Sequence, residues 1–207
     1  MSELSSSRSP RLLLYLHGFL SSPQSHKCRL LEDWLACERP DVDFCAPLIS
    51  PHPASATAAL EQVVEEYRGD IGLVGSSMGG FYASLLAERH GLSAVVVNPA
   101  VHPARFMPAY VGQPLLPYSG ESREYRLTAA DVDNMRSLER ELQLPLRGRY
   151  WLLAQRGDET LDCREAEAFY AGQRQTIEDG GDHGFQGFER YCEAIVDFLF
   201  GRKAENT

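Results

Sequence analysis

The sequence predicts an α/β protein with a mostly parallel, doubly wound β-sheet. Short apolar runs alternate with longer stretches of helical periodicity along the 207 residues, and Gly-containing turns follow several of these runs. Such alternation favours parallel strands whose carboxyl ends meet at one edge, where these folds bind ligands. The expected strands are 11–16, 42–46, 71–75, 93–97, 150–155 and 174–178. The expected helices are 25–38, 55–68, 78–90, 130–141, 163–172 and 187–200.

The first strand is apolar enough for the centre of a sheet and runs directly into His17 and Gly18. Gly18 permits a turn after which the backbone N–H of Phe19 can face a substrate carbonyl, as in an oxyanion loop. We expect His17 to order this loop by hydrogen bonding rather than to act as a base. Phe19 and Leu20 are expected to form part of a pocket floor.

The third strand leads into the pattern G-x-S-x-G, which runs from Gly75 to Gly79 with Ser77 at its centre. Strand, G-x-S-x-G and helix in succession are typical of a nucleophile elbow, a sharp turn that presents the serine hydroxyl above the sheet. Glycine at both flanking positions removes side chains that would clash in such a turn. The N–H of Met78 is the second expected oxyanion donor, at the start of a helix whose dipole favours negative charge.

The fourth strand is followed by a long stretch, 99–127, that has no clear periodicity and contains five prolines. It can be an irregular connection whose apolar residues cover the sheet edge, or a small cap over Ser77. We favour the cap, because long loops inside a compact domain are usually functional. Phe106, Met107 and Tyr110 are the expected pocket residues in this stretch.

The fifth strand ends at a turn, 156–160, that presents Asp158. In folds with a nucleophile elbow the acid lies between the serine and the histidine in the chain, after a strand. Asp158 is therefore the predicted acid. Glu159 and Asp162 remain alternatives, the latter if the turn is longer than expected.

The sixth strand is followed by a Gly-rich loop, 179–185, that carries His183 before the last helix. A histidine at this place can reach over the elbow and act as the base. Asp182 is adjacent to it and is expected to order the loop or to be exposed. His183 would take the proton of Ser77 and return it to the leaving group, while Asp158 would orient the imidazole.

Each of these features alone is weak evidence, because serine, histidine and aspartate are common in Gly-rich turns. Their occurrence after three separate strands, in the order Ser77, Asp158, His183, predicts a catalytic triad on an α/β-hydrolase fold.

Five segments carry a resemblance to a known family. They are His-Gly-Phe-Leu-Ser-Ser-Pro at 17–23, Gly-Ser-Ser-Met-Gly-Gly at 75–80, Asn-Pro-Ala-Val at 98–101, Gly-Asp-Glu at 157–159 and Gly-Gly-Asp-His-Gly-Phe at 180–185. The chain resembles the YqiA-type esterases, small bacterial α/β-hydrolases, from about Leu12 to about Phe200. This resemblance implies an esterase for short acyl esters or acyl thioesters. It places the nucleophile at Ser77, the acid at Asp158 and the base at His183.

Composition narrows the classes of partner. The formal net charge of −9, without a basic run, argues against nucleic acid. The five cysteines have no zinc spacing, and with no signal peptide in view they suggest reduced thiols in a cytoplasm. No membrane span, metal or organic cofactor is expected. We expect a polar tail at 1–10 and one domain at 11–201, and the oligomeric state stays open.

Three functions compete. The first is a serine esterase acting on a small ester through an acyl-enzyme on Ser77. The second is a thioesterase for acyl-CoA-like substrates, which would use the same residues and for which Arg105 and Arg123 are the available cations. The third is a binding protein with a hydrolase fold and no catalytic turnover. An intact triad argues against this third function.

Overall fold

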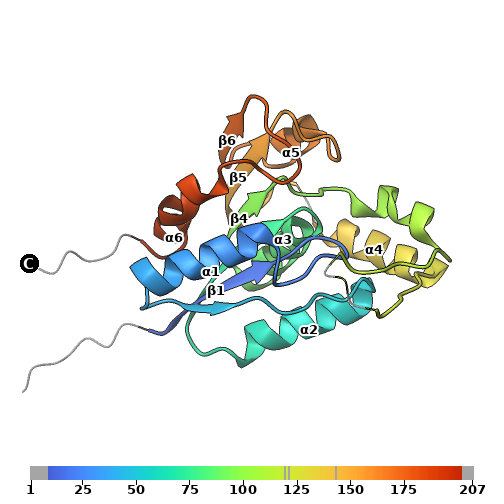
Figure 1. Ribbon diagram of the computed structural model, residues 1–207, viewed down its shortest axis with the longest axis horizontal. Helices are drawn as coiled ribbons and strands as arrows, with labels where there is room; N and C mark the ends of the chain where they lie inside the picture. The colour runs from blue at the N-terminus through green and yellow to red at the C-terminus, as the bar shows by residue number, and fades with distance from the viewer. Residues whose placement is uncertain (1–8, 119, 121, 143, 202–207) are drawn as a thin grey trace, which may run out of the picture.

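The computed structural model describes residues 9–118, 120, 122–142 and 144–201 of the chain. Six parallel strands form one sheet in the order β2-β1-β3-β4-β5-β6, which confirms the predicted α/β class (Figure 1). The strands are β1 (Arg11–Leu16), β2 (Asp43–Cys45), β3 (Asp70–Ser76), β4 (Ser93–Val97), β5 (Arg149–Gln155) and β6 (Arg174–Glu178). Three of them have the bounds expected from the sequence. The strand β5 begins one residue earlier than expected, and β2 and β3 each differ by one residue at both ends.

Helices cover both faces of the sheet (Figure 1). One face packs against α1 (His26–Glu38) and α6 (Cys192–Phe200). The other face packs against α3 (Met78–His90), α2 (Pro53–Glu66) and α5 (Cys163–Phe169), and α4 (Ala129–Glu141) lies against α2. The described helices are too short or too polar for a transmembrane span.

An apolar core lies on each face of the sheet, and the strands contribute side chains to both cores. In β1, Leu13 and Tyr15 belong to the core beneath α1 and α6, while Leu14 and Leu16 belong to the core beneath α3. Successive side chains of a strand point to opposite faces. A parallel strand covered on both sides is therefore apolar at every position, which explains the unbroken apolar runs of the sequence.

The sheet reverses its winding direction between β1 and β3. The chain leaves β1 through α1 to β2 on one side, then returns through α2 to β3 on the other side of β1. The ends of β1 and β3 are paired, with Leu16 opposite Gly75. The loop after β1 and the turn after β3 therefore meet at a topological switch point, the usual ligand-binding position in such sheets.

The structure differs from the predicted helices near the C-terminus. The segment predicted as one helix over 187–200 is a short 3₁₀ turn, Phe188–Tyr191, followed by α6. Gly187 has a left-handed backbone (φ 73°) and lies before that turn. The helix predicted over 163–172 ends at Phe169. Of the predicted N-terminal tail, residues 1–8 lie outside the described residues.

The stretch 99–127 contains two 3₁₀ turns, Pro103–Arg105 and Met107–Tyr110. Two isolated bridges, Val111 to Leu127 and Leu115 to Tyr125, tie its later part together. The N–H of Tyr118 donates to the carbonyl of Leu20 at 2.8 Å. The stretch thus returns to the loop after β1, close to the turn after β3.

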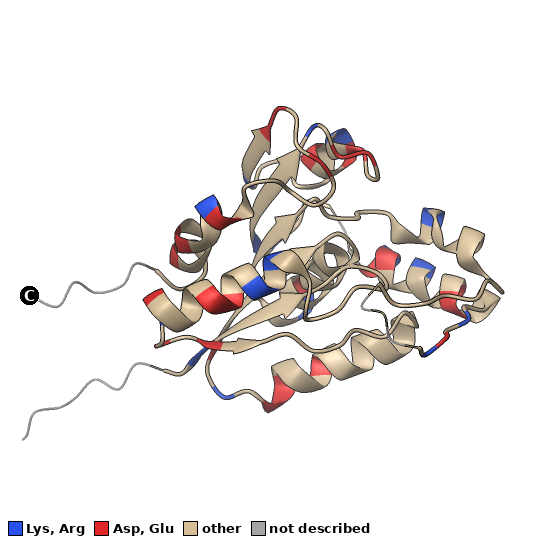
Figure 2. Ribbon diagram, viewed as in Figure 1, with Lys and Arg blue, Asp and Glu red and all other residues tan. Residues whose placement is uncertain are grey.

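Lysine and arginine residues are scattered among aspartate and glutamate over the described ribbons (Figure 2). In the full sequence the acidic residues outnumber lysine and arginine, 29 to 20.

Candidate active site

Ser77 occupies the turn between β3 and α3 in a backbone conformation that side chains rarely adopt (φ 55°, ψ −123°). The end of β4 holds this turn in place. The N–H of Ser77 donates to the carbonyl of Val97 at 3.0 Å, and its carbonyl accepts from the N–H groups of Gly80 and Ala100. Such strain persists only when the surroundings over-determine the conformation.

Two glycines make the turn possible by permitting close backbone approach. A Cβ atom on Gly79 would overlap the carbonyl of Leu16 at the end of β1, and one on Gly75 would overlap the carbonyl of Gly79. Gly18 lies against the nucleophile turn as well, since a Cβ there would be 3.3 Å from the Cβ of Ser77. The glycines therefore let β1, β3 and α3 meet at a single point.

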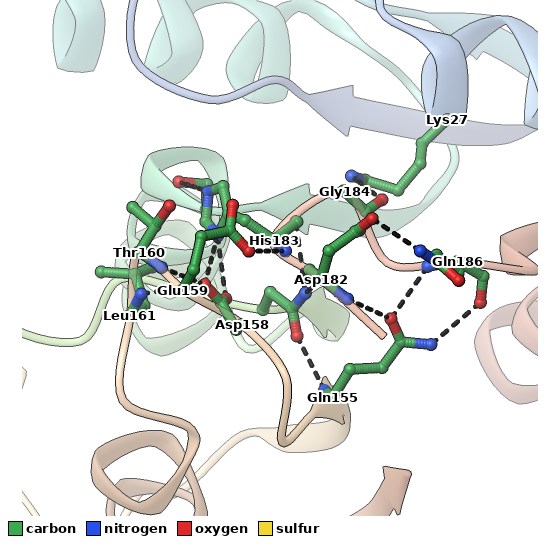
Figure 3. A network of polar contacts seen from close by, with 12 residues as sticks. Lys27, Gln155, Asp158, Glu159, Thr160, Leu161, Asp182, His183, Gly184 and Gln186 are labelled. Atoms are coloured by element: carbon green, nitrogen blue, oxygen red, sulfur yellow. Dashed lines mark hydrogen bonds and ion pairs between the residues drawn. The ribbon is translucent and has the colours of Figure 1, made fainter. Parts of the chain in front are cut away.

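The structure brings Ser77, His183 and Asp158 into one hydrogen-bonded chain. The distance from Ser77 Oγ to His183 Nε2 is 3.1 Å, and His183 Nδ1 lies 2.8 Å and 3.0 Å from the two carboxylate oxygens of Asp158 (Figure 3). The side chain of Asp158 is 2% exposed and that of His183 is 25% exposed. Because an ionised carboxylate only accepts, Nδ1 carries the proton and Nε2 is free to accept the serine proton.

The carboxylate of Asp158 is held by its own turn. Its Oδ1 accepts from the N–H groups of Thr160 at 2.8 Å and Leu161 at 2.9 Å. Burial alone would raise the pKa of Asp158, but the hydrogen bonds from His183, Leu161 and Thr160, with the charge of His183, outweigh it and lower that pKa. Asp158 therefore stays ionised beside the imidazole.

The alternative acids have other contacts. Glu159 accepts from the backbone N–H of His183 at 3.1 Å, and Asp162 caps α5 through the N–H of Arg164. The carboxylate of Asp182 accepts from Gln186 at 2.8 Å. These three side chains hold the loops of the site, and Asp158 alone among the four bonds to the imidazole.

Two polar residues that the sequence analysis did not assign to the site support the His183 loop. Asn98 follows β4 with φ 40°, and its amide donates to the carbonyls of Asp182 and His183. Gln155 ends β5 and accepts from the N–H groups of Asp182 and Gln186. The sequence did offer a signal for both residues, since each is a polar residue at the end of an apolar strand.

His17 joins two loops rather than reaching Ser77. Its Nε2 accepts from the N–H of Ile49 at 3.0 Å, and its Nδ1 lies 2.9 Å from the carbonyl of Gly18. The first contact requires an unprotonated Nε2, so Nδ1 carries the proton. Burial lowers the pKa of His17, which keeps the ring neutral. This geometry agrees with the predicted ordering function.

A cavity of about 540 Å³ opens beside Ser77 and His183. Of the predicted site residues, Phe19, Met78, Phe106 and Tyr110 line it. The N–H groups of Phe19 and Met78 have no acceptor within the described part of the chain. Both are therefore available to a ligand in this cavity.

The structure differs from the predicted pocket at two positions. Met107 is 1% exposed and packs in the core beneath α3, α2 and α4, so it does not line the cavity. Leu20 is 7% exposed and points into the same core, next to a void of about 10 Å³ behind the loop. Both side chains face inward because large apolar groups gain most from burial.

Several lining residues were absent from the sequence-based pocket. They come from β1 and the loop after it, the start of α1, the end of β3, the stretch 99–127 and the turn after β5: Tyr15, Ser21, Ser25, Lys27, Ser76, Tyr118, Thr160 and Leu161. No group of three metal-ligating side chains occurs among the described residues.

Known proteins share this architecture. The model of a family described as "Uncharacterised protein family (UPF0227)" matches residues 12–200. Est1E from Butyrivibrio proteoclasticus is 17% identical, with a TM-score of 0.71 over 94% of this chain and 88% of that one. A putative hydrolase from Agrobacterium vitis S4 is 16% identical, with a TM-score of 0.73 over 92% and 88%. Mouse alpha/beta hydrolase domain-containing protein 10 is 14% identical, with a TM-score of 0.69 over 91% and 88%. At these identities the likeness shows the α/β-hydrolase fold.

Proposed function

The chain belongs to the uncharacterised protein family UPF0227, the YqiA-type family, and we propose that it is a serine esterase for short-chain carboxylic esters. The observation that carries this proposal is the chain of contacts from Ser77 through His183 to Asp158, at the wall of a cavity. A nucleophile, a base and a group that orients the base are the components of acyl transfer through a covalent intermediate.

In the proposed reaction, Ser77 Oγ attacks the ester carbonyl as His183 Nε2 takes its proton. Asp158 stabilises the imidazolium and holds the ring through Nδ1. The protonated Nε2 then donates to the departing alcohol, leaving an acyl group on Ser77. Water, activated by the same imidazole, attacks that acyl group, and Ser77 recovers its proton when the carboxylic acid departs.

The negative charge on the tetrahedral oxygen would be met by the N–H groups of Phe19 and Met78. Met78 is the first residue of α3, so its N–H lies at the positive end of a helix of 13 residues. The loop that carries Phe19 is fixed by the hydrogen bond from the N–H of Ile49 to His17. Donors fixed in advance in this way stabilise charge at the moment when it develops.

The cavity favours a small substrate. Its volume of about 540 Å³ lies in the range of ordinary small-molecule sites. Phe106, Tyr110 and Tyr118 supply aromatic surface from the stretch 99–127, in agreement with the proposed cap. An acyl chain packed against these rings would have its apolar surface removed from water, which favours binding.

A thioesterase is the second candidate, since the same nucleophile can attack a thioester. Neither of the cations considered for a CoA handle lines the cavity. Arg105 pairs with Glu165, and the guanidinium of Arg123 lies 5.1 Å from the ring centre of Tyr125. These contacts give no support to either arginine as a CoA handle.

The test compares p-nitrophenyl acetate, butyrate and octanoate as substrates for the wild type and Ser77→Ala. We expect Ser77→Ala to lower kcat/KM by about 10⁴-fold or more, because the nucleophile is lost. Equal rates in both proteins would overturn the assignment of Ser77.

A fluorophosphonate probe separates the enzyme from a binding protein with the same fold. An activated Ser77 should be labelled in the wild type and not in Ser77→Ala. Absence of labelling in folded wild type would support the non-catalytic alternative.

A further inference from the structure

One end of the cavity carries positive charge in an acidic protein. The chain has 29 acidic residues, but no Asp or Glu of the described residues lines the cavity, whereas Lys27 does. Lys27 is the second residue of α1, and the N-cap residue Ser25 also lines the cavity, so the N-terminus of this 13-residue helix lies at the cavity wall. The lysine that lines the cavity therefore carries a charge opposite in sign to the net charge of the protein.

The ammonium of Lys27 has fewer partners than it can bind. Its Nζ donates to the carbonyl of Gly184 at 2.7 Å, and among the described residues no carboxylate forms an ion pair with it (Figure 3). An ammonium has three N–H donors and no acceptor. Burial lowers the pKa of Lys27 to about 8, with Asp182 and Asp158 acting in the opposite direction. The two carboxylates offset the cost of burying this cation only in part, since the pKa of Lys27 stays lowered, so an anionic ligand would stabilise it further.

Two hydroxyls beside Lys27 are also available to a ligand. Ser25 Oγ is buried and has no hydrogen-bond partner, although Ser25 is the N-cap residue of α1. Tyr15 is 1% exposed, and burial raises the pKa of its phenol far above neutrality, so it remains a donor. Ser25 and Ser76 lie near that phenol and act to lower its pKa, against the larger effect of burial. The three side chains of Tyr15, Ser25 and Lys27 line the same cavity as Ser77.

We propose that Tyr15, Ser25 and Lys27 form a subsite for an acidic group of the substrate, so that the preferred substrate is an ester that also carries a carboxylate or phosphate. A cluster of donors with a cation and no carboxylate calls for an acceptor with negative charge. The subsite rests on the proposed esterase function and names the substrate class for it.

Matched pairs of esters test the proposal. Ethyl hydrogen glutarate and ethyl pentanoate differ by an acidic group in the acyl half, and 4-acetoxybutanoate and butyl acetate differ by one in the alcohol half. We expect the wild type to favour the acidic member of one pair by about tenfold or more in kcat/KM, as one charge-assisted hydrogen bond allows. The pair that responds identifies the half of the ester that carries the acid.

The variants separate recognition from support of the His183 loop. Lys27→Met should bring the ratio within the responding pair to near one, Lys27→Arg should keep part of the preference, and Ser25→Ala should lower it several-fold. If Lys27 only supports the loop through Gly184, Lys27→Met would lower kcat for both members equally and keep the ratio, which would overturn the proposal. Arg105→Met is the matched control, because it removes one exposed positive charge outside the cavity.

A binding experiment does not depend on turnover. The chain has only two lysines, Lys27 and Lys203, so lysine labelled with ¹³C at Cε gives two resonances, and Lys27→Met identifies the one of interest. Ethyl hydrogen glutarate or 4-acetoxybutanoate, added to Ser77→Ala, should shift the Lys27 resonance, while the neutral partners should not. A shift without hydrolysis by the wild type would keep the subsite and refute the esterase. Hydrolysis with neither a shift nor a preference for an acidic ester would refute the subsite alone.

Discussion

The turns that carry Ser77, Asp158 and His183 differ in kind from the stretch 99–127 beside them. Each of these turns follows a strand of the sheet, and backbone hydrogen bonds and close contacts at glycines define its geometry. The stretch 99–127 also has backbone hydrogen bonds, but these do not decide where its side chains point, because its neighbours Phe106 and Met107 point to the cavity and to the core respectively. The difference indicates that backbone turns fix the chemistry, whereas side-chain packing shapes the substrate pocket.

The largest expected effect within the strand-end turns is that of Asp158→Asn. An asparagine can offer its amide N–H to His183 and favour the wrong tautomer, so we expect kcat to fall by about 10³–10⁴-fold. Asp162→Asn is the matched control, since that carboxylate caps α5 without touching the imidazole. Steady-state kinetics on p-nitrophenyl butyrate measures both, and a comparable loss in Asp162→Asn would point to Asp162 as the acid.

Gly79→Ala tests whether close backbone approach defines the elbow. The new Cβ would overlap the carbonyl of Leu16, which cannot move without disturbing β1, so the free energy of unfolding should fall by about 3 kcal/mol or more. Gly91 has a left-handed backbone with open space around it. Gly91→Asn should therefore cost about 1 kcal/mol or less. Urea unfolding measures both variants, and similar losses would show that the contact at Gly79 is not special.

Met107→Ala and Tyr110→Ala probe the two sides of the stretch 99–127. Met107 is 1% exposed, so its truncation should lower the free energy of unfolding by about 2–5 kcal/mol. Tyr110 is 36% exposed and lies against Phe19 at the cavity, so its truncation should cost only about 1 kcal/mol.

Substrate profiles separate these two variants further. Tyr110→Ala should change the ratio of kcat/KM for octanoate over acetate several-fold, because its ring lines the cavity. Met107→Ala should leave that ratio close to the wild-type value. An unchanged profile in Tyr110→Ala would count against the proposed cap.

The smallest expected effect is the contribution of Asp158 to stability in acid. Its folded-state pKa is lowered, so its stabilising contribution is present above the unfolded pKa of about 4 and is lost as the pH falls through the folded value. The free energy of unfolding of the wild type should therefore fall more steeply below about pH 4 than that of Asp158→Asn. Parallel pH dependences would mean that the folded pKa is not lowered.

Helix and strand positions followed from local patterns of the sequence. The strands 11–16 and 93–97 were predicted with their observed bounds, since a buried parallel strand is apolar along most of its length. The edge strand 174–178 was also predicted with its observed bounds, although its sequence is mostly polar. The helix expected over 187–200 was only partly correct, because Gly187 lies before a separate 3₁₀ turn. A single left-handed residue of this kind leaves no trace in hydrophobic periodicity.

The sequence by itself determined the parallel sheet, the elbow and the order of its candidate catalytic residues, because glycine requirements and apolar runs act over a few neighbouring residues. Only the tertiary structure decided which side chains meet in the cavity. Lys27 reaches a carbonyl 157 residues further along the chain, and Met107 turns into the core while Phe106 does not. Such contacts depend on how whole elements pack, since burial and charge pairing act between surfaces that are brought together only in the folded protein.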